Sequence, residues 1–186
     1  MRETARLLRP AFFSFLILTL LCGVIYPGFV TVAGQLFYPS QANGSIITVT
    51  LQDGTKKTYG SELIAQEFTK PEYLIGRPSG TSNLSPVSEK QEKLVKERIE
   101  WWHQFDPDNL ANIPMDLVTA SGSGVDPNIS PQAAEYQVAR IAKARGISEK
   151  TTREIIVKYT TGKFLGIWGE EAVNVLKVNL ALDGLL

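Results

Sequence analysis

An uncharged, apolar segment near the N-terminus constrains this chain more than any other feature. No charged residue lies between Arg9 and Asp53, and residues 11–32 read AFFSFLILTLLCGVIYPGFVTV. Folded as an α-helix, that stretch would be roughly 33 Å long at about 1.5 Å per residue, which is enough to cross a hydrocarbon core of about 30 Å. The sequence therefore predicts a single transmembrane helix, which we place at residues 10–36.

The charges on either side of this helix predict its orientation. Residues 1–9 carry three arginines and one glutamate, whereas no basic residue follows the helix until Lys56. Basic residues are retained on the cytoplasmic side of a bilayer. We therefore expect residues 1–9 to form a short cytoplasmic tail and residues 37–186 to form a soluble domain on the outer side.

A cleavable signal peptide is the main alternative to a retained anchor. The apolar core of a signal peptide is typically about 7–15 residues long, and the uninterrupted run over residues 11–26 is slightly longer. Residues 31–33 (Thr-Val-Ala) offer a weak cleavage site. The length of the run favours a retained anchor.

Three residue types within the anchor have predicted roles. Gly23 and Gly28 would let partner helices approach closely. Pro27, together with Gly28, would kink the helix near its outer end. Cys22 is the only cysteine of the chain and lies in this segment, so the outer domain is expected to fold without a disulfide.

The size and net charge of the outer domain limit the classes of function that it can have. The chain has 19 basic and 19 acidic residues; three of the basic and one of the acidic residues lie in the N-terminal tail, which leaves 16 basic against 18 acidic. A net charge of about −2 gives no electrostatic footprint for nucleic acid and no polybasic patch for anionic lipid. At about 150 residues, the domain has the size of one ordinary folding unit.

Apolar periodicity and turn residues predict an α+β domain, because a regular βαβ alternation is absent. The Asp53-Gly54 pair predicts a hairpin between strands at residues 46–51 and 56–59. The other predicted elements are strands at residues 73–77, 115–120 and 173–182, with a helical turn as the alternative for the end of the last one, and helices at residues 60–68, 86–105, 131–145 and 149–162. The expected N-caps of these helices are Ser61, Ser85, Ser130 and Ser148. The apolar stripe of the helix at 86–105 consists of Val87, Leu94, Val95, Ile99 and Trp102.

Few side chains indicate catalytic chemistry. His103 is the only histidine, and no second histidine or cysteine lies at metal-ligand spacing from it. No serine sits in a G-x-S-x-G elbow. A structural role is therefore favoured for His103, and an anchored enzyme is the least favoured class of function.

Two polar loops and one aromatic side chain are the candidate contact sites. Ser121 and Ser123 lie in a glycine-rich loop whose backbone N–H groups can cradle a phosphate. A plain strand-to-helix connection explains the same pattern, because the P-loop and dinucleotide-binding patterns are absent. Ser82 and Asn83 lie in a second polar loop. Trp101 lies off the apolar stripe of its helix and is a candidate contact to a partner.

A more specific signal comes from residues 117–145, which read LVTASGSGVDPNISPQAAEYQVARIAKAR. This stretch resembles the signature region of the KdpC family, whose members are components of the Kdp-type potassium-transporting P-type ATPase. Further segments that agree with this family, in its order, are residues 26–27, 34–35, 41–45, 60–61, 64–66, 77–79, 82–84 and 173–183. The family's insertion between the Arg-Pro-Ser and Ser-Asn-Leu segments is reduced here to Gly80-Thr81, which puts any contact made by that loop in doubt.

The resemblance implies a complex in the bacterial inner membrane. In such a complex, one large subunit (KdpA) conducts potassium, a second (KdpB) hydrolyses ATP, and a small accessory membrane subunit is also present. This chain would be the non-catalytic subunit that stabilises the assembly and acts as a catalytic chaperone, raising the ATP affinity of the hydrolysing subunit. The sequence has no Asp-Lys-Thr-Gly-Thr phosphorylation motif, no Thr-Val-Gly-Tyr-Gly filter and no Walker motif.

By the same resemblance, Gln137 is the nucleotide-linked residue, although it equally fits the polar face of a capped helix. ATP is then the implied cofactor, either shared with the hydrolysing subunit or acting through it, and no metal site is predicted. Because ATP is cytoplasmic and the domain is predicted outside, any effect on ATP affinity would be a coupling through the assembly. The alternative function is a membrane-anchored extracytoplasmic binding or sensor module, with a pocket formed by the loops at 80–84 and 121–126.

Overall fold

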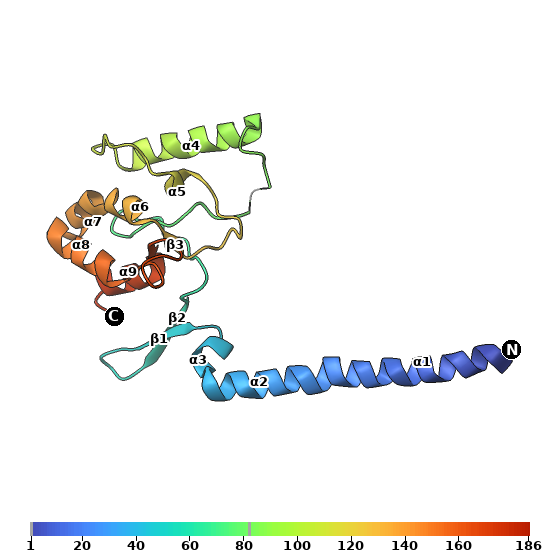
Figure 1. Ribbon diagram of the computed structural model, residues 1–186. Coiled ribbons are helices and arrows are strands. Elements are labelled where there is room, and N and C mark those ends of the chain that lie inside the picture. Colours follow the sequence, from blue (N-terminus) through green and yellow to red (C-terminus); the bar gives the residue numbers. More distant parts are fainter. Residues whose placement is uncertain (1, 82) are drawn as a thin grey trace. The chain divides into compact units, whose positions relative to one another are not determined.

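The chain consists of two compact units, Met1–Ile46 and Ile47–Leu186. The computed structural model describes residues 2–81 and 83–186, and its helices and strands are labelled in Figure 1. The first unit is helical, and the second is a mixed α/β domain, as predicted.

The first unit contains a long helical run followed by one short helix. The run consists of α1 (Arg2–Leu20), a π-helical segment η1 (Leu21–Ile25) and α2 (Tyr26–Phe37), and α3 (Pro39–Ala42) follows it. The stretch Arg6–Phe37 has 32 residues, and its most apolar part is 0% buried within the protein. The predicted apolar helix is thus present, and it is long and apolar enough to cross a membrane.

The π-helical segment lies where Pro27 disturbs the regular helix. Proline lacks an N–H, and its ring would press on the carbonyl of the residue four positions earlier, here Gly23. The N–H of Tyr26 instead bonds the carbonyl of Leu21, five positions back, which widens this turn. A π turn is a known way of absorbing such a conflict, and it lies just before the proline at which the sequence predicts a kink.

The second unit begins with the predicted β-hairpin. Strands β1 (Ile46–Thr50) and β2 (Lys56–Ser61) pair with each other. The Leu51 N–H donates to the Thr55 carbonyl at 2.8 Å, and Gly54 adopts a positive φ of 82°. The Asp53 carboxylate accepts the Thr55 N–H at 2.9 Å. The turn chemistry read from the sequence is therefore confirmed.

The rest of this unit packs helices around a three-stranded antiparallel sheet of order β3-β5-β4. Val173 of the central strand pairs with Ile129 on one side and Thr160 on the other. The elements are α4 (Glu89–Phe105), α5 (Met115–Val118), β3 (Asn128–Ile129), α6 (Pro131–Glu135), α7 (Val138–Arg145), α8 (Glu149–Lys158), β4 (Thr160–Thr161), β5 (Ala172–Asn174) and α9 (Val175–Leu182).

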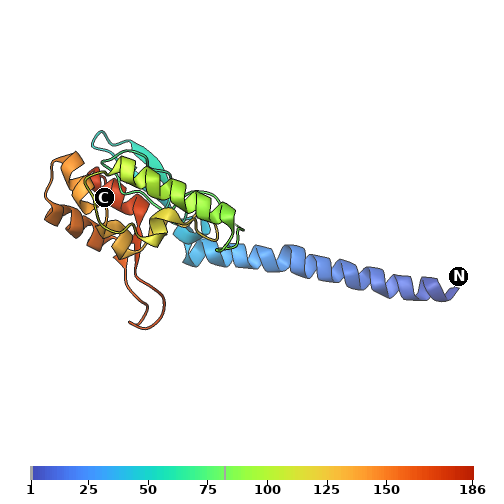
Figure 2. The same cartoon turned by 90° about the horizontal axis from the view of Figure 1, so that it is seen from above.

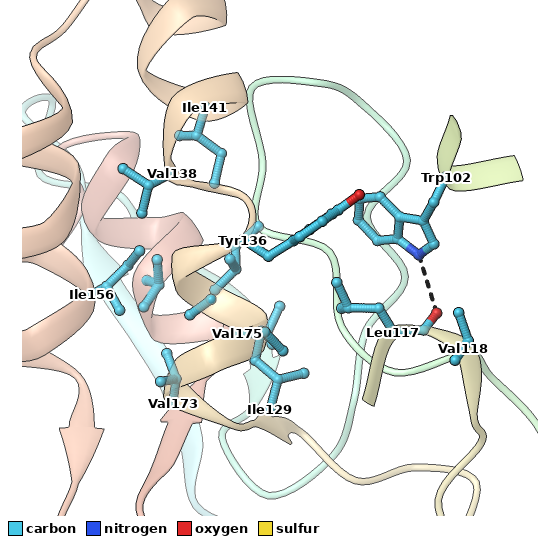
Figure 3. Packing of buried hydrophobic residues seen from close by; sticks show 14 residues of the cluster. Trp102, Leu117, Val118, Ile129, Tyr136, Val138, Ile141, Ile156, Val173 and Val175 are labelled. Carbon is cyan, nitrogen blue, oxygen red and sulfur yellow. Dashed lines mark hydrogen bonds between the residues drawn. The ribbon is translucent and has the colours of Figure 1, made fainter. Parts of the chain in front are cut away.

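The core of this unit joins the sheet to α4 through one tryptophan. Trp102 is 1% exposed, as predicted, and its indole N–H donates to the Leu117 carbonyl at 3.1 Å (Figure 3). Tyr136 meets the Trp102 ring edge-on, with ring centres 5.6 Å apart. Other buried members of the core are Leu74, Ile129, Val138, Ile141, Ile156, Val173, Val175 and Val178.

Several predicted helix ends are confirmed. The Ser130 hydroxyl accepts the Ala133 N–H at 3.2 Å, and the Ser148 hydroxyl accepts the Thr151 N–H at 3.0 Å. Gly146 ends α7 in the left-handed conformation, with φ 66°. The helix predicted at 131–145 is nevertheless two helices, α6 and α7, which are separated at residues 136–137.

Three predicted elements are wrong because tertiary contacts override the local pattern. The helix predicted at 60–68 is a loop: the Ser61 hydroxyl accepts the Leu63 N–H at 3.1 Å, but the Ala65 N–H then donates to the Val125 carbonyl at 2.8 Å. The strand predicted at 115–120 is instead the helical turn α5. The segment predicted as a strand at 73–77 is irregular and is held by side chains instead of by a strand.

Two further predictions need a change of bounds. The helix predicted from residue 86 begins at Glu89, because the Ser88 hydroxyl, not that of Ser85, accepts an N–H of the first turn. Val87 is consequently outside the helix and 93% exposed. The segment predicted as a strand at 173–182, with a helical turn as the alternative for its end, is strand only as far as Asn174 and helical from Val175. The Asn174 side chain accepts the Lys177 N–H at 3.0 Å and starts α9.

Candidate functional site

The signature region surrounds the irregular segment at residues 71–77, which we call the strap. The strap is held by side chains from the α7 and α9 regions. The Asn179 amide accepts the Leu74 N–H at 2.7 Å and donates to the Leu74 carbonyl at 2.9 Å. A side-chain amide offers one acceptor and two donors, so Asn179 takes the place of a paired peptide group.

Gln137 binds the next residue of the strap in the same way. Its side-chain oxygen accepts the Ile75 N–H at 2.8 Å, and its amide nitrogen donates to the Ile75 carbonyl at 2.9 Å. The amide nitrogen also donates to the Ala133 carbonyl at 3.1 Å, and Arg140 donates to the side-chain oxygen at 2.6 Å. Gln137 is 0% exposed, and both of its amide hydrogens are used.

Arg140 extends this network to the start of the strap. Its guanidinium donates to the Tyr73 carbonyl at 3.1 Å and to the Pro71 carbonyl. It also lies over the Phe105 ring, 4.9 Å from the ring centre. Burial lowers the pKa of Arg140 to about 10, so the side chain keeps its charge at neutral pH. A buried charge needs such partners to offset lost hydration.

Arg145, at the end of α7, ties the strap to the C-terminal segment. Its guanidinium donates to the Glu72 carbonyl at 2.7 Å and to the Leu182 carbonyl at 2.6 Å. It also pairs with Asp183 at 2.7 Å. The Tyr73 hydroxyl donates to the other Asp183 oxygen at 3.0 Å, and burial, followed by this hydrogen bond, raises the pKa of Tyr73.

The far end of the strap is fixed by an ion pair. Arg77 binds Asp116 of α5 at 2.7 Å and donates to the Thr119 hydroxyl at 3.2 Å. The second Asp116 oxygen accepts the Ser130 N–H at 2.7 Å, at the N-cap of α6. The strap thus connects α5, α6, α7 and α9, the elements to which the signature region and the C-terminus contribute.

The structure brings the two predicted polar loops together, and their backbones are in direct contact. The Gly80 N–H donates to the Gly124 carbonyl at 3.3 Å. Gly124 has φ 72°, and a Cβ built on it would lie 2.6 Å from the Thr81 nitrogen. The Ser121 hydroxyl accepts the Asp126 N–H at 3.4 Å, so this serine serves its own loop.

The remaining candidates of the polar loops and of the long helix differ in their surroundings. Ser123 is exposed and accepts the Val125 N–H at 3.2 Å. Asn83 is exposed, whereas Ser82 lies outside the described residues. Gly23 and Gly28 face open space on the long helix, since a Cβ on either would meet nothing within 4 Å. Both glycines therefore leave room for the close approach of another helix.

Trp101 lies where a partner contact was predicted, on the surface of α4. It is 41% exposed and stacks on Phe105 with ring centres 4.6 Å apart. Together with Arg77 and Arg98 it lines a groove of about 510 Å³. His103 is exposed on the same helix. Within residues 2–81 and 83–186, no group of three or more His, Cys, Asp or Glu side chains is placed to hold a metal ion.

Sequence reasoning missed most of the strap network. Asn179 sits inside the apolar run VLKVNLAL, and a single amide in such a run is the signal that could have marked it. A polar group in a core is found where a partner satisfies it. Arg140 and Arg145 lie at the polar end of the signature and would ordinarily be assigned to the solvent-exposed face of α7.

These features define a small mixed α/β protein that carries a helix long and apolar enough to span a membrane. The family model described as "KdpC: K+-transporting ATPase, c chain" matches residues 8–184. A potassium-transporting ATPase KdpC subunit of Listeria welshimeri is 55% identical over 188 residues, covering 100% of this chain and 99% of the relative. The chain therefore belongs to the KdpC family of potassium-transporting ATPase subunits.

More distant relatives agree over nearly the whole length. The protein of the same name from Clostridium perfringens is 51% identical, with 97% of this chain and 98% of the relative covered. That from Methylococcus capsulatus is 47% identical, with 95% and 97% covered. Because the match includes both the apolar helix and the α/β unit, the two parts belong together in this family.

Proposed function

We propose that this chain is a non-catalytic accessory subunit of an ATP-driven potassium uptake complex in the bacterial inner membrane. It stabilises the assembly of the potassium-conducting subunit, the ATP-hydrolysing subunit and a small accessory membrane subunit. The observation that carries this proposal is the match to the KdpC family over residues 8–184. The Gln137 and Arg140 side chains of the signature region are turned inward onto the domain's own backbone, which favours a structural over a catalytic use.

The proposed orientation of the chain rests on its N-terminal arginines. Arg6 and Arg9 precede an apolar helix that ends at Phe37. Since basic residues stay in the cytoplasm, the α/β unit lies on the outer face. There it contacts the extracellular side of the partner subunits, where potassium enters, and it has no access to cytoplasmic nucleotide.

The surroundings of Gln137 do not fit a nucleotide. The side chain is 0% exposed, and its amide is saturated by Ile75, Ala133 and Arg140. A ligand there would have to displace the strap. We therefore infer that the ATP linkage of the family acts through the hydrolysing subunit, by a coupling free energy that is typically about 1–3 kcal/mol.

Co-expression with the partner subunits tests the assembly role. A tag on this chain is expected to retain both large subunits in mild detergent, and deleting the chain should lower the yield of the intact complex. A full-length chain that stays a stable lone monomer beside its co-expressed partners would contradict the proposal.

A topology experiment tests the orientation independently. A protease site placed after Leu186 should be cleaved in intact spheroplasts, whereas the same site before Arg2 should be cleaved only after lysis. Cleavage at the N-terminal site in intact spheroplasts would reverse the orientation. In that case direct contact between the domain and ATP would become tenable again.

A further inference from the structure

We propose that the loop between β4 and β5 is a docking finger that inserts into an apolar socket, bordered by basic side chains, on a partner subunit. We define the apolar finger as residues 163–169, Lys-Phe-Leu-Gly-Ile-Trp-Gly. This inference rests on the proposed role in assembly and identifies the surface that serves it. None of the residues singled out from the sequence lies in this loop.

The finger combines large apolar side chains with high exposure. Phe164, Leu165, Ile167 and Trp168 are 68%, 72%, 78% and 65% exposed. Figure 2 shows the loop, coloured between α8 and α9 in the sequence scale, projecting away from the body of its unit. Single exposed apolar residues are common, but a contiguous group of this kind marks an interaction site.

The finger is preorganised by its own backbone. Phe164 and Trp168 exchange both of their N–H···O hydrogen bonds, at 2.7 and 3.0 Å. The N–H groups of Gly166 and Ile167 donate to carbonyls of the same loop at 3.1 and 3.2 Å. The Phe164 and Trp168 rings stack with centres 6.3 Å apart and an interplanar angle of 15°. A rigid aromatic anchor loses little entropy on binding.

Leu165 of the finger adopts a backbone conformation that is unfavourable for a residue with a side chain. Leu165 has φ 53°, in the left-handed region that non-glycine residues rarely occupy. Its side chain nevertheless gains no burial in the unit, since it is 72% exposed. Strain of this kind persists where function uses it. Burial of Leu165 in a socket would supply the stabilisation that the free unit lacks.

The charged residues next to the finger indicate what kind of surface it contacts. Glu170 and Glu171 follow it directly, both are exposed, and neither has an ion-pair partner within residues 2–81 and 83–186. Lys163 is the only cation of the loop. An acidic pair is repelled by the anionic surface of a bacterial bilayer, which attracts basic clusters instead. Basic side chains bordering a protein socket complement it.

Photocrosslinking within the complete complex tests this assignment. A photoreactive amino acid is placed at Ile167 or Trp168 and, as the matched control, at Val87, which is 93% exposed but isolated. Crosslinks from both finger positions to a partner subunit, and none from Val87, are expected. Crosslinks from the finger only to lipid or to a second copy of this chain would overturn the proposal, as would none in an assembled complex.

Substitutions measure the contribution of the finger to assembly. Replacing both Ile167 and Trp168 by Asp should weaken association about 30-fold, the loss expected for a hot spot, whereas Val87→Asp should leave it unchanged. Thermal unfolding of the variant chain should match that of the wild type, since these side chains are exposed. Unchanged association of the finger variant would refute the inference.

Charge reversal tests the basic border of the socket. Glu170→Lys combined with Glu171→Lys should slow association and reverse its salt dependence, because attraction would become repulsion. Equal association rates for variant and wild type at low salt would exclude a basic border. If the wild-type chain fails to assemble at all, the proposed function fails; if it assembles and only the finger tests are negative, the inference alone is wrong.

Discussion

Replacing Gln137 by methionine separates its structural role from a role in nucleotide binding. Methionine has nearly the same volume, so the change removes polar interactions without a large cavity. It abolishes the two hydrogen bonds with the Ile75 backbone, the bond to the Ala133 carbonyl and the charged bond from Arg140. The Ala133 carbonyl and the Arg140 guanidinium stay buried and the Ile75 backbone groups stay part-buried, and each of them loses this partner.

The magnitude follows from the kind of bond that is broken. A neutral hydrogen bond contributes about 1 kcal/mol, a bond to a charged group about 1.5–3 kcal/mol, and a buried group left unsatisfied loses its full hydration. We expect Gln137→Met to lower the free energy of unfolding by about 3–5 kcal/mol. A marginally stable domain has only about 5–15 kcal/mol in total, so the melting temperature should fall by on the order of 10 °C.

The assay is unfolding of the full-length chain in detergent by urea, followed by circular dichroism. Gln132→Met is the matched control, because Gln132 is exposed on α6, five residues from Gln137. The control should stay within about 0.5 kcal/mol of the wild type. An equally stable Gln137→Met chain that nevertheless reduces the ATP affinity of the assembled complex would refute the structural reasoning and support a ligand contact.

Three further predictions use interactions elsewhere in the second unit. Arg145→Met should destabilise the chain by about 2–4 kcal/mol because it removes a charged donor from the part-buried Glu72 and Leu182 carbonyls, whereas Arg153→Met, which breaks only exposed ion pairs, should leave the unfolding free energy almost unchanged. Gly124→Ala should cost more than about 2 kcal/mol, because its φ is 72° and the new Cβ would meet Thr81, and Gly122→Ala, where a Cβ meets nothing, should be tolerated in the same thermal melt. The Tyr136 hydroxyl has no hydrogen-bond partner within the described part of the chain, so Tyr136→Phe should raise the unfolding free energy at pH 7 by about 1 kcal/mol. Burial raises the pKa of Tyr136 above its usual value of about 10, so above that pH the unfolded chain loses this proton first; the wild type should then lose stability faster than the Phe variant in alkaline urea titrations.

Local signals in the sequence were sufficient for the elements that depend on local chemistry. The Asp53-Gly54 turn, the serine caps of α6 and α8 and the left-handed Gly146 each follow from the conformational preferences of one or two residues. The long apolar helix also follows from composition and length alone. In each case the physical cause lies within a few residues of its effect, so no knowledge of the fold was needed.

The elements that were predicted wrongly depend on distant partners. The run at residues 173–182 is apolar on nearly every side, because β5 lies at the centre of its sheet and α9 is packed into the core. A short run of this kind fits a buried strand or a buried helix equally well. The strap was predicted to contain a strand at 73–77, but its backbone there bonds the side-chain amides of Asn179 and Gln137 and not a neighbouring strand.

The position of Gln137 explains why a sequence motif can indicate two different roles. A glutamine near two arginines is a reasonable ligand site if the three side chains converge on open space. Here they converge on the strap. The side-chain oxygen of Gln137 accepts hydrogen bonds from both the Ile75 N–H and Arg140, and Arg140 also donates to the Tyr73 carbonyl. The number of donors left free, and not the residue types, decides between these roles, and both hydrogens of the Gln137 amide are already used.

Substitutions in the polar strap network and substitutions in the apolar finger should have different effects. Changes in the strap network act on the folding of the unit itself, because the side chains of Gln137, Arg140 and Asn179 bind the unit's own backbone. Changes in the apolar finger leave the unit folded, because Leu165, Ile167 and Trp168 contact solvent and not the core. A substitution in the first group should therefore reduce the amount of folded protein at any partner concentration. A substitution in the second group should be rescued by raising the concentration of the partner, as mass action requires for a weakened interface.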